Sequence, residues 1–515
     1  MSAPTLDDAI SLIEQKNFDQ AEAILVQLRA MNPANARVNY ALAVVAIQKN
    51  DLISALALLD ASTRVATEQP FVYSTFSSVL LRLGDKTAAY KMASKATALA
   101  PKSSQSHIAL GEVYAEQEKH DLAIQSYETA LTYAPENVSL LAILSRHHRK
   151  LGDTAKADSL LSEALEKDSQ NPDALVEAAS VDGWPNQEQI GTTIENLLKD
   201  RDRELDEEHW YNLSRAAAHL AEKRGDWASA FAHHNNDRAA LNRQYNTQHR
   251  DWQVKTIKEA FTQDYFAKRR EVSSSSNRPI FVVGMPSSGI QEIEAILARH
   301  PNVKTGGEIG YFGALGMRLS EGEDISPNYF RAAVNMGGKD FKKISSGYLK
   351  VLEGIDRKAK HIVDVNAFNY QHLWLLALLY PNASFIHAFR SPLDACASTY
   401  TAKLPHGHHY NIDQKSLGHH YRTYGDMMDH WSQTLPVSVH HVSYEALINN
   451  REEEIGKLLT HVGLAHDAVY IEREMAEHEP VGQNAADKIG FGRDHQEHLA
   501  ELSETLGPLA NVRLS

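Results

Sequence analysis

Cysteine is nearly absent from the sequence: Cys396 is the only one in 515 residues, so an internal disulfide framework is impossible. Long hydrophobic runs are also missing, since no stretch approaches the ~18 apolar residues that a membrane-spanning helix needs. No basic block occurs, and 66 acidic against 52 basic residues give a formal net charge of -14, which disfavours nucleic-acid binding. Met1–Asp8 lacks the basic and apolar regions of a signal peptide. We therefore expect a cytoplasmic protein with neither a nucleic acid nor a membrane as partner.

The length and composition indicate more than one globular domain. A chain of 515 residues is too long for one hydrophobic core, and 43% hydrophobic residues are enough to build several. In residues 5–175, apolar residues recur at helical spacing, with helix-breaking residues about every 17 positions. This pattern predicts a series of short helices joined in pairs.

The helical pairs repeat with a regular period. Prolines close the successive units at Pro33, Pro70, Pro101, Pro135 and Pro172. Their separations centre on the roughly 34-residue period of tetratricopeptide repeats. The clearest unit alternates small and large residues in the order needed for close helix packing, at Leu110, Gly111, Tyr114, Ala123, Tyr127, Ala130 and Pro135. We therefore predict an α-solenoid at residues 1–180, followed by a degenerate helical repeat and connector at residues 181–270.

Helical solenoids commonly use their extended concave surface for binding. We expect the concave face formed by the first helices of the repeats to bind a peptide or protein. The alternative that the sequence leaves open is a plain solenoid without a bound peptide.

A glycine-rich loop follows the first apolar strand-like run after the helical region. Residues 279–283 have the composition of a buried strand, residues 284–289 contain glycines at both ends, and an amphipathic helix is expected from Ile290 to Arg299. In such a strand-loop-helix arrangement, backbone N–H groups at the start of the helix can face a phosphate. Ile290 and Gln291 replace the Lys-Ser/Thr pair of nucleotide triphosphatases, so an ATPase or kinase is disfavoured.

Several separated motifs in this second region extend the pattern. They are Val-Gly-Met-Pro-x-Ser-Gly and Gly-Gly-Glu within residues 280–308, Tyr-Pro-Asn-Ala at 380–383, Phe-Arg-Ser-Pro-Leu-Asp at 389–394 with Ser398, Val-x-Tyr-Glu-x-Leu at 442–447, and Gly492-Arg493. In this order they resemble the sulfotransferases that use 3'-phosphoadenosine 5'-phosphosulfate (PAPS), and in particular the protein-tyrosine branch. With the repeats, the whole chain resembles bacterial-type proteins that fuse tetratricopeptide repeats to a sulfotransferase domain. The resemblance implies an α/β P-loop-like domain with a central parallel sheet, which we place at residues 278–515.

The resemblance also implies a set of site residues and PAPS as co-substrate, with no metal. Glu308 matches the carboxylate that acts as base, and Arg390 with Ser398 matches the pair that holds the 3'-phosphate. The full set of expected cofactor-binding residues is Gly284, Ser287, Ser288, Gly289, Ile290, Gln291, Arg390, Ser398, Gly492 and Arg493. From the residues alone, simpler alternatives stay open: Glu308 could cap a helix, and Arg390 could form an ordinary ion pair with Asp394.

Two departures from the family pattern concern positive charge. The family loop usually reads Pro-Arg-Ser-Gly-Thr, whereas Ser287 occupies the place of the arginine, and Val365 occupies the place of a downstream lysine. The loss of one such donor typically costs on the order of 100- to 1000-fold in rate. Lys304 and Arg278 are the candidates for a replacement cation. Two hypotheses follow: a sulfotransferase that transfers a sulfuryl group to a hydroxyl, tyrosine among them, of a recruited peptide or protein; or a catalytically weak or inactive binding protein with this fold. We favour the enzyme.

Overall fold

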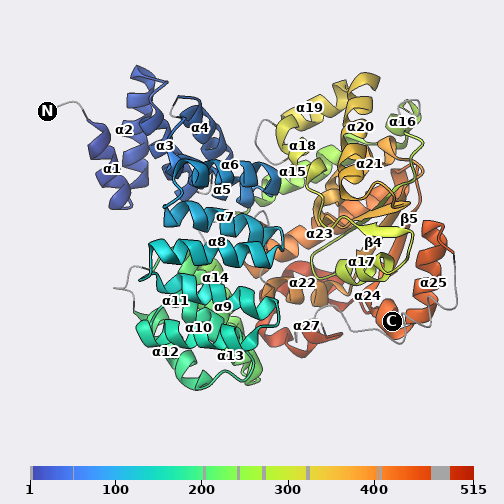
Figure 1. Ribbon diagram of the computed structural model, residues 1–515. Helices are drawn as coiled ribbons and strands as arrows, with labels where there is room; N and C mark the ends of the chain where they lie inside the picture. Colours follow the sequence, from blue (N-terminus) through green and yellow to red (C-terminus); the bar gives the residue numbers. More distant parts are fainter. Residues whose placement is uncertain are drawn as a thin grey trace. The chain divides into compact units, whose positions relative to one another are not determined.

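The computed structural model describes residues 4–49, 51–65, 67–200, 205–240, 244–269, 274–320, 325–402, 404, 409–465 and 488–514. The chain divides into two compact units, Met1–Asn242 and Arg243–Ser515 (Figure 1). This division lies inside the stretch predicted as the connector. No helix in these ranges is long and apolar enough to cross a membrane.

The first unit is helical throughout its described residues. Its helices are α1 (Leu6–Glu14), α2 (Phe18–Met31), α3 (Ala36–Gln48), α4 (Leu52–Val65), α5 (Pro70–Arg82), α6 (Lys86–Leu99), α7 (Ser104–Glu116), α8 (His120–Tyr133), α9 (Val138–Lys150), α10 (Thr154–Lys167), α11 (Pro172–Ser180), α12 (Gln187–Lys199), α13 (Glu207–Lys223) and α14 (Trp227–Ala240). Consecutive helices pack as antiparallel pairs, and helices two apart also make contact, α5 with α7, α9 with α11 and α11 with α13. This is a solenoid of helical hairpins (Figure 1).

The predicted repeat period is confirmed by the positions of the helices. Helices α3, α5, α7, α9 and α11 begin at residues 36, 70, 104, 138 and 172, so each starts 34 residues after the previous one. Asn35, Ser103, Asn137 and Asn171 cap four of these helices with their side chains, while Pro70 and Pro172 stand at the first helical positions. Side-chain caps and N-terminal prolines both stabilise helix starts, which explains why the period is so regular.

Close packing within the α7–α8 hairpin depends on a missing side chain. A Cβ atom on Gly111 would lie 2.6 Å from a ring carbon of Tyr127, a distance that real contacts do not reach. Tyr127, Ala123 and Ala130 are buried on α8 against this gap. The small residues of the sequence pattern therefore serve helix packing, as predicted.

The turns inside three of the hairpins share a left-handed residue at the same position of the repeat. Gly84 and Gly152 adopt left-handed backbone conformations, with φ of 81° and 82°, and Glu118 lies midway between them with φ of 58°. The left-handed conformation costs a residue with a side chain roughly 1–2 kcal/mol. Glycine avoids this cost, but it loses more conformational entropy on folding, which offsets part of the gain. We expect Glu118→Gly to raise the free energy of unfolding by about 0.5–1 kcal/mol in urea titrations. As a matched control, Gly152→Ala should lower it, and equal stability of Glu118→Gly and the parent would contradict the assigned strain.

The second unit is an α/β structure. Its elements before the third strand are α15 (Thr247–Ala260), α16 (Gln263–Ala267), β1 (Pro279–Gly284), α17 (Ile290–Ala298), β2 (Val303–Thr305), α18 (Tyr311–Leu319), α19 (Pro327–Asn335) and α20 (Gly338–Ile355). The later elements are β3 (His361–Asp364), η2 (Ala367–His372), α21 (Leu373–Leu379), β4 (Ser384–Phe389), α22 (Pro392–Thr401), η3 (His409–Ile412), α23 (Gln414–Thr434), β5 (Val439–Ser443), α24 (Tyr444–Asn449), α25 (Arg451–Val462), α27 (Phe491–Asp494), η5 (Gln496–His498), α28 (Ala500–Leu506) and η6 (Gly507–Asn511).

The five strands form one parallel sheet in the order β2-β3-β1-β4-β5, which confirms the predicted central parallel sheet. All six residues of β1 are buried, because this strand lies in the middle of a sheet covered on both faces. Since the strands are parallel, the segments that follow β1, β3, β4 and β5 leave the sheet at the same edge. Any site built from these segments must lie there.

Two helices before the sheet contribute to the core of this unit. Phe261, at the end of α15, is fully buried and stacks on Trp374 of α21 with ring centroids 4.3 Å apart. Arg250 of α15 is also buried, where it donates hydrogen bonds to Tyr370 Oη at 3.0 Å and Gln371 Oε1 at 3.1 Å. Residues 244–269 are therefore packed into the α/β unit.

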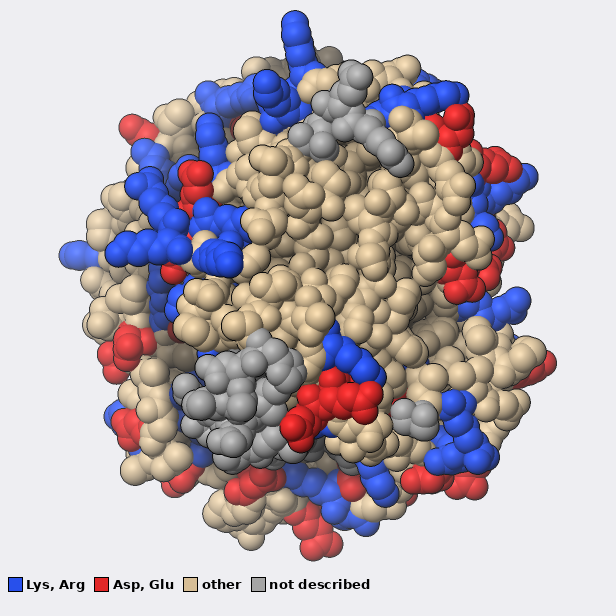
Figure 2. All heavy atoms as spheres, turned by 90° about the vertical axis from the view of Figure 1, so that its right-hand side faces the viewer, with Lys and Arg blue, Asp and Glu red and all other residues tan. Residues whose placement is uncertain are grey.

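Charged residues are unevenly distributed over the surface. On the face drawn in Figure 2, Lys and Arg side chains gather over the upper left part, and a broad central area carries neither Lys or Arg nor Asp or Glu. Because the chain as a whole is acidic, this group of Lys and Arg side chains does not reflect the overall composition.

Candidate active site

The glycine-rich loop leaves the central strand β1 at the carboxyl edge of the sheet. Ser287 and Gly289 adopt left-handed conformations, with φ of 60° and 94°, and Ser288 closes the loop by donating from Oγ to the Met285 carbonyl oxygen at 2.6 Å. A Cβ on Gly284 would lie 2.7 Å from Ser288 Oγ and closer still to the Ala388 carbonyl oxygen. Both glycines are thus required by the geometry of a tight loop.

The loop leads directly into the N-terminus of α17. Its N-cap is Gly289, and no side chain caps the helix, so the first backbone N–H groups are not satisfied by a capping side chain. Ile290 is buried in the core, whereas Ser287 is half-buried and Gln291 is exposed. Ile290 can therefore contribute only its backbone N–H to an anion, while the other two can also offer side chains.

Arg390 and Ser398 are brought together at the end of β4. Arg390 Nη1 donates to Ser398 Oγ at 2.9 Å, and Nη2 donates to the Lys488 carbonyl oxygen at 2.8 Å. The Asp394 carboxylate lies 3.9 Å from Nη2, so the expected pair with Asp394 is a long contact. Arg390 is 1% exposed and Ser398 2% exposed. A ligand can reach this guanidinium only if the chain around it shifts.

The Gly492-Arg493 turn lies beside Arg390, and Asp394 holds it there. The Asp394 carboxylate accepts from Gly490 N–H at 2.6 Å and from Gly492 N–H at 2.8 Å. A Cβ on Gly492 would lie 2.7 Å from the Leu393 carbonyl oxygen, so the turn packs tightly on α22. Arg493 itself is exposed. The sequence motifs around residues 390 and 492, about a hundred positions apart, thus form one local structure.

Tyr444 is the residue that sequence reasoning left without a role. Its ring lies 4.9 Å from the Arg390 guanidinium, and a Cβ on Gly289 would lie 2.8 Å from its Cδ2 atom. It therefore stands between the glycine-rich loop and Arg390. The neighbouring Glu445 is buried and accepts from Ser391 N–H at 2.8 Å, which fixes the chain after β4. Tyr444 belongs to the Val-x-Tyr-Glu motif, but the spacing of that motif does not reveal that its ring contacts Arg390 and the glycine-rich loop.

Glu308 is an exposed residue on the segment between β2 and α18. The backbone around it is bound to the end of β3, since Gly306 N–H donates to the Val363 carbonyl oxygen at 2.8 Å and Val365 N–H to the Gly307 carbonyl oxygen at 3.0 Å. Helix α18 begins at Tyr311 and has Gly310 as its N-cap, with no side-chain cap. Glu308 is thus held at the same sheet edge as the glycine-rich loop.

A buried carboxyl, Asp364, binds the backbone next to Glu308. It accepts from Tyr348 Oη at 2.8 Å and from Ile309 N–H at 3.4 Å, and Asn366 N–H donates to it at 3.1 Å. Burial raises the pKa of Asp364 to about 7, and these hydrogen bonds oppose the rise. The sequence offered Asp364 only as part of an altered motif, so its role beneath Glu308 was not predicted.

The cations named as replacements lie elsewhere. Arg278 precedes β1 and Lys304 is paired with Ile362 near the beginning of β3, so both are at the amino edge of the sheet. Val365 is only 5% exposed and packs in the core formed by β1 and α17. A lysine at position 365 would therefore have to leave this core to reach the loop.

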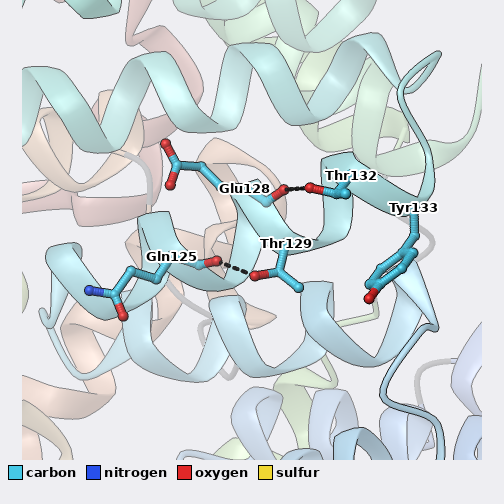
Figure 3. A pocket seen from close by; sticks show the side chains of 5 residues that line it. All are labelled: Gln125, Glu128, Thr129, Thr132 and Tyr133. Atoms are coloured by element: carbon cyan, nitrogen blue, oxygen red, sulfur yellow. Dashed lines mark hydrogen bonds between the residues drawn. The ribbon is translucent and has the colours of Figure 1, made fainter.

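The first unit, which does not contain this site, has a hollow on α8. It has a volume of about 330 Å³ and is lined by Gln125, Glu128, Thr129, Thr132 and Tyr133 (Figure 3). Thr129 and Thr132 donate to the Gln125 and Glu128 carbonyl oxygens of their own helix. Its two threonine hydroxyls are thus engaged. No group of three or more His, Cys, Asp or Glu among the described residues could hold a metal ion there or elsewhere.

A buried histidine behind the site gives a pH-dependent expectation. His387 of β4 is hydrogen-bonded to His441 at 2.8 Å and to the Tyr424 hydroxyl, and burial lowers its pKa to about 3. Because the folded-state pKa lies below the unfolded value of about 6.5, stability is full above pH 6.5 and is lost as the pH falls toward 3. Between pH 7.5 and pH 5, the free energy of unfolding should therefore fall by about 2 kcal/mol less in His387→Gln than in the parent, as measured by urea titrations. Parallel pH profiles of variant and parent would contradict this.

Comparison with known proteins agrees with this geometry. Residues 279–468 match the model of the sulfotransferase family, residues 12–73 and 114–179 match one tetratricopeptide repeat model, and residues 75–138 match another. A putative protein-tyrosine sulfotransferase of Caenorhabditis briggsae is 27% identical over 213 residues, which cover 41% of this chain and 72% of that protein.

Two further similarities differ in how much of each chain they cover. An uncharacterized protein of Aquifex aeolicus is 24% identical over 335 residues, covering 63% of this chain. The match spans only 43% of that relative's length. The crystal structure of MamA is 20% identical and covers 33% of this chain and 98% of its own, with a TM-score of 0.30. The chain thus joins tetratricopeptide repeats to a domain of the sulfotransferase family.

Proposed function

We propose that the protein is a PAPS-dependent sulfotransferase that modifies a hydroxyl of a peptide or protein bound by its repeats, with tyrosine as a candidate acceptor. The observation that carries the proposal is the convergence of the loop at 284–291, Arg390 with Ser398, and Glu308 at one edge of a parallel sheet. A protein-tyrosine sulfotransferase among the similar proteins supports tyrosine as the acceptor.

The residues present fit the phosphate groups of PAPS. The left-handed Ser287 and Gly289 and the start of α17, which has no side-chain cap, suit a phosphate, because backbone N–H groups and the helix dipole favour an anion. The fork of Arg390 with the Ser398 hydroxyl suits the 3'-phosphate once the segment at Lys488 moves aside. When bound, PAPS supplies an activated sulfuryl group, and Glu308 takes the proton of the acceptor hydroxyl.

A second candidate, a binding protein with little or no turnover, is favoured by one observation. At the two positions where the family places cations there are a serine and a buried valine, and Arg278 and Lys304 lie at the opposite sheet edge. Negative charge that builds on the leaving phosphate then lacks its strongest donors. In this case, the nucleotide site remains and the repeats supply the function as a scaffold.

Calorimetric titration with 3'-phosphoadenosine 5'-phosphate tests the nucleotide site directly. We expect binding by the parent protein, and a loss of roughly 1.5–3 kcal/mol, or about 10- to 150-fold in Kd, in Arg390→Ala. Arg422→Ala, an exposed arginine of α23, is the matched control and should bind normally. Circular dichroism and thermal unfolding verify that Arg390→Ala is folded.

A radiolabelled sulfate transfer assay with tyrosine peptides then separates the two candidates. Binding with transfer supports the enzyme, and binding without transfer supports the scaffold. If the folded parent does not bind the nucleotide at all, both readings of the site are wrong.

A further inference from the structure

An unpaired basic face runs along α20, on the side of the helix that faces solvent. Its members are the exposed Lys339, Lys342, Lys343, Lys350, Arg357 and Lys358. Lys339, Lys343 and Lys350 are spaced by four and seven residues, which places them on one stripe of the helix. Among the described residues none of the six forms an ion pair, although many Lys and Arg elsewhere in the chain do.

The charge of this face contrasts with that of the chain. Residues 331–360 contain eight Lys and Arg against three Asp and Glu, a net charge of +5, in a chain with a net charge of -14. Of the three acids, Asp340 accepts from Gly337 N–H at 2.9 Å, and Asp356 accepts from Lys358 N–H and Ala359 N–H. Two of the three carboxylates are thus held by backbone N–H groups, and with all three counted the segment still carries a net charge of +5.

The C-terminal end of the basic face is hollowed. A depression of about 640 Å³ is lined by Lys350, Glu353, Gly354, Ile355, Asp356 and Arg357. Ile355 is 40% exposed and lines it, so the hollow has an apolar part beside its charged groups.

The hollow is separate from the candidate active site. Helix α20 ends at Ile355 and the chain enters β3 at His361, so the hollow lies near the start of β3. Arg278, directly before β1, donates to the Asp356 carbonyl oxygen. The amino ends of β1 and β3 lie at the edge opposite to the glycine-rich loop. A molecule bound in this hollow does not occupy the nucleotide site.

We propose that the α20 basic face and its hollow bind an acidic polypeptide segment of a partner protein. The cations along a helix of 18 residues, about 27 Å long, match the acidic side chains of about eight extended residues. An apolar side chain of the same segment fits the hollow beside Ile355 and Gly354.

Two other anionic partners fit the observations less well. A nucleic acid duplex carries one charge per ~1.7 Å but offers no apolar side chain for the hollow beside Ile355. A membrane surface is flat and would leave the hollow empty, whereas a polypeptide can place a side chain in it. The charge and the concave shape together favour the polypeptide.

The test uses the full chain and fluorescence anisotropy with a labelled peptide of alternating Glu and Leu. The charge-reversed variant is Lys343→Glu with Lys350→Glu and Arg357→Glu. The matched control reverses three exposed lysines of the first unit, Lys91→Glu with Lys95→Glu and Lys102→Glu, and changes the net charge equally. We expect the first variant to bind at least tenfold more weakly and the control to bind within about twofold of the parent.

Further measurements decide the identity of the occupant. Affinity for the peptide should fall as salt is raised, and binding of 3'-phosphoadenosine 5'-phosphate should be the same in both triple variants. Equal loss of peptide binding in both variants would overturn the proposal, because net charge alone would then explain it. Tighter binding to duplex DNA or to phosphatidylserine vesicles than to the peptide, or self-association that the α20 substitutions abolish, would also overturn it.

Discussion

Replacing Phe261 with alanine should destabilise the α/β unit by about 3–5 kcal/mol, the usual cost of removing a buried aromatic ring. The Phe261 ring is fully buried, stacks on Trp374 and lies 6.2 Å from the ring of Trp431. Urea unfolding of the full chain, followed by tryptophan fluorescence, measures the loss. Val334→Ala is the matched control: this side chain is 50% exposed and should cost less than about 0.5 kcal/mol. Similar midpoints for the two variants would show that α15 does not belong to the core.

The same packing indicates that the α/β unit must begin no later than α15. A chain that starts at Arg278 lacks Phe261, Arg250 and the rest of α15, and so exposes the faces of Trp374 and Tyr370 that they cover. The sequence predicted residues 181–270 as a connector because their apolar pattern loses the repeat period. Trp374 and Trp431, which Phe261 contacts, lie more than a hundred residues away in the sequence, and periodicity cannot reveal contacts at that range.

The repeats could be predicted well because their packing is local. Each helix of a solenoid contacts its neighbours in sequence, so the period of small residues and prolines encodes most of the structure. The strand-loop-helix at residues 279–299 is local too. Gly284, Ser288 and Gly289 all form the predicted loop, since a tight turn between a strand and a helix requires residue types that are visible in the sequence.

The rest of the candidate site depends on distances that the sequence does not contain. Arg390 was expected to face a ligand, but in the structure Lys488 and Tyr444 enclose it. Lys304 looked close enough to the loop to replace a missing cation, and the strand register places it at the other edge of the sheet. In the sequence, Val365 stands where the family has a lysine, and only the structure shows that this side chain is buried in the core.

Glu308→Gln should lower kcat by about 100- to 10,000-fold, provided that the protein is a sulfotransferase as proposed, because an amide cannot accept the proton of the acceptor hydroxyl. The glutamine keeps the size of the side chain and leaves the backbone bonds of Gly306 and Val365 in place. The Kd for 3'-phosphoadenosine 5'-phosphate should therefore stay within about twofold of the parent, since the proposal assigns Glu308 to the acceptor proton and not to a phosphate contact. Single-turnover sulfate transfer and calorimetry measure the two quantities independently.

Asp364→Asn separates the proton acceptor from the structure that holds it. The amide can still contact Tyr348 Oη and Ile309 N–H, so Glu308 should stay in position and kcat should fall far less than in Glu308→Gln. The folded-state pKa of Asp364 is raised to about 7, above its unfolded value, so the aspartate costs stability as the pH rises toward 7. Asn does not ionise, and the variant should therefore gain stability relative to the parent at pH 8 but not at pH 4. If Glu308→Gln retains full activity while Asp364→Asn loses it, the base is not Glu308, and the buried carboxyl or a group that it positions must take the proton instead.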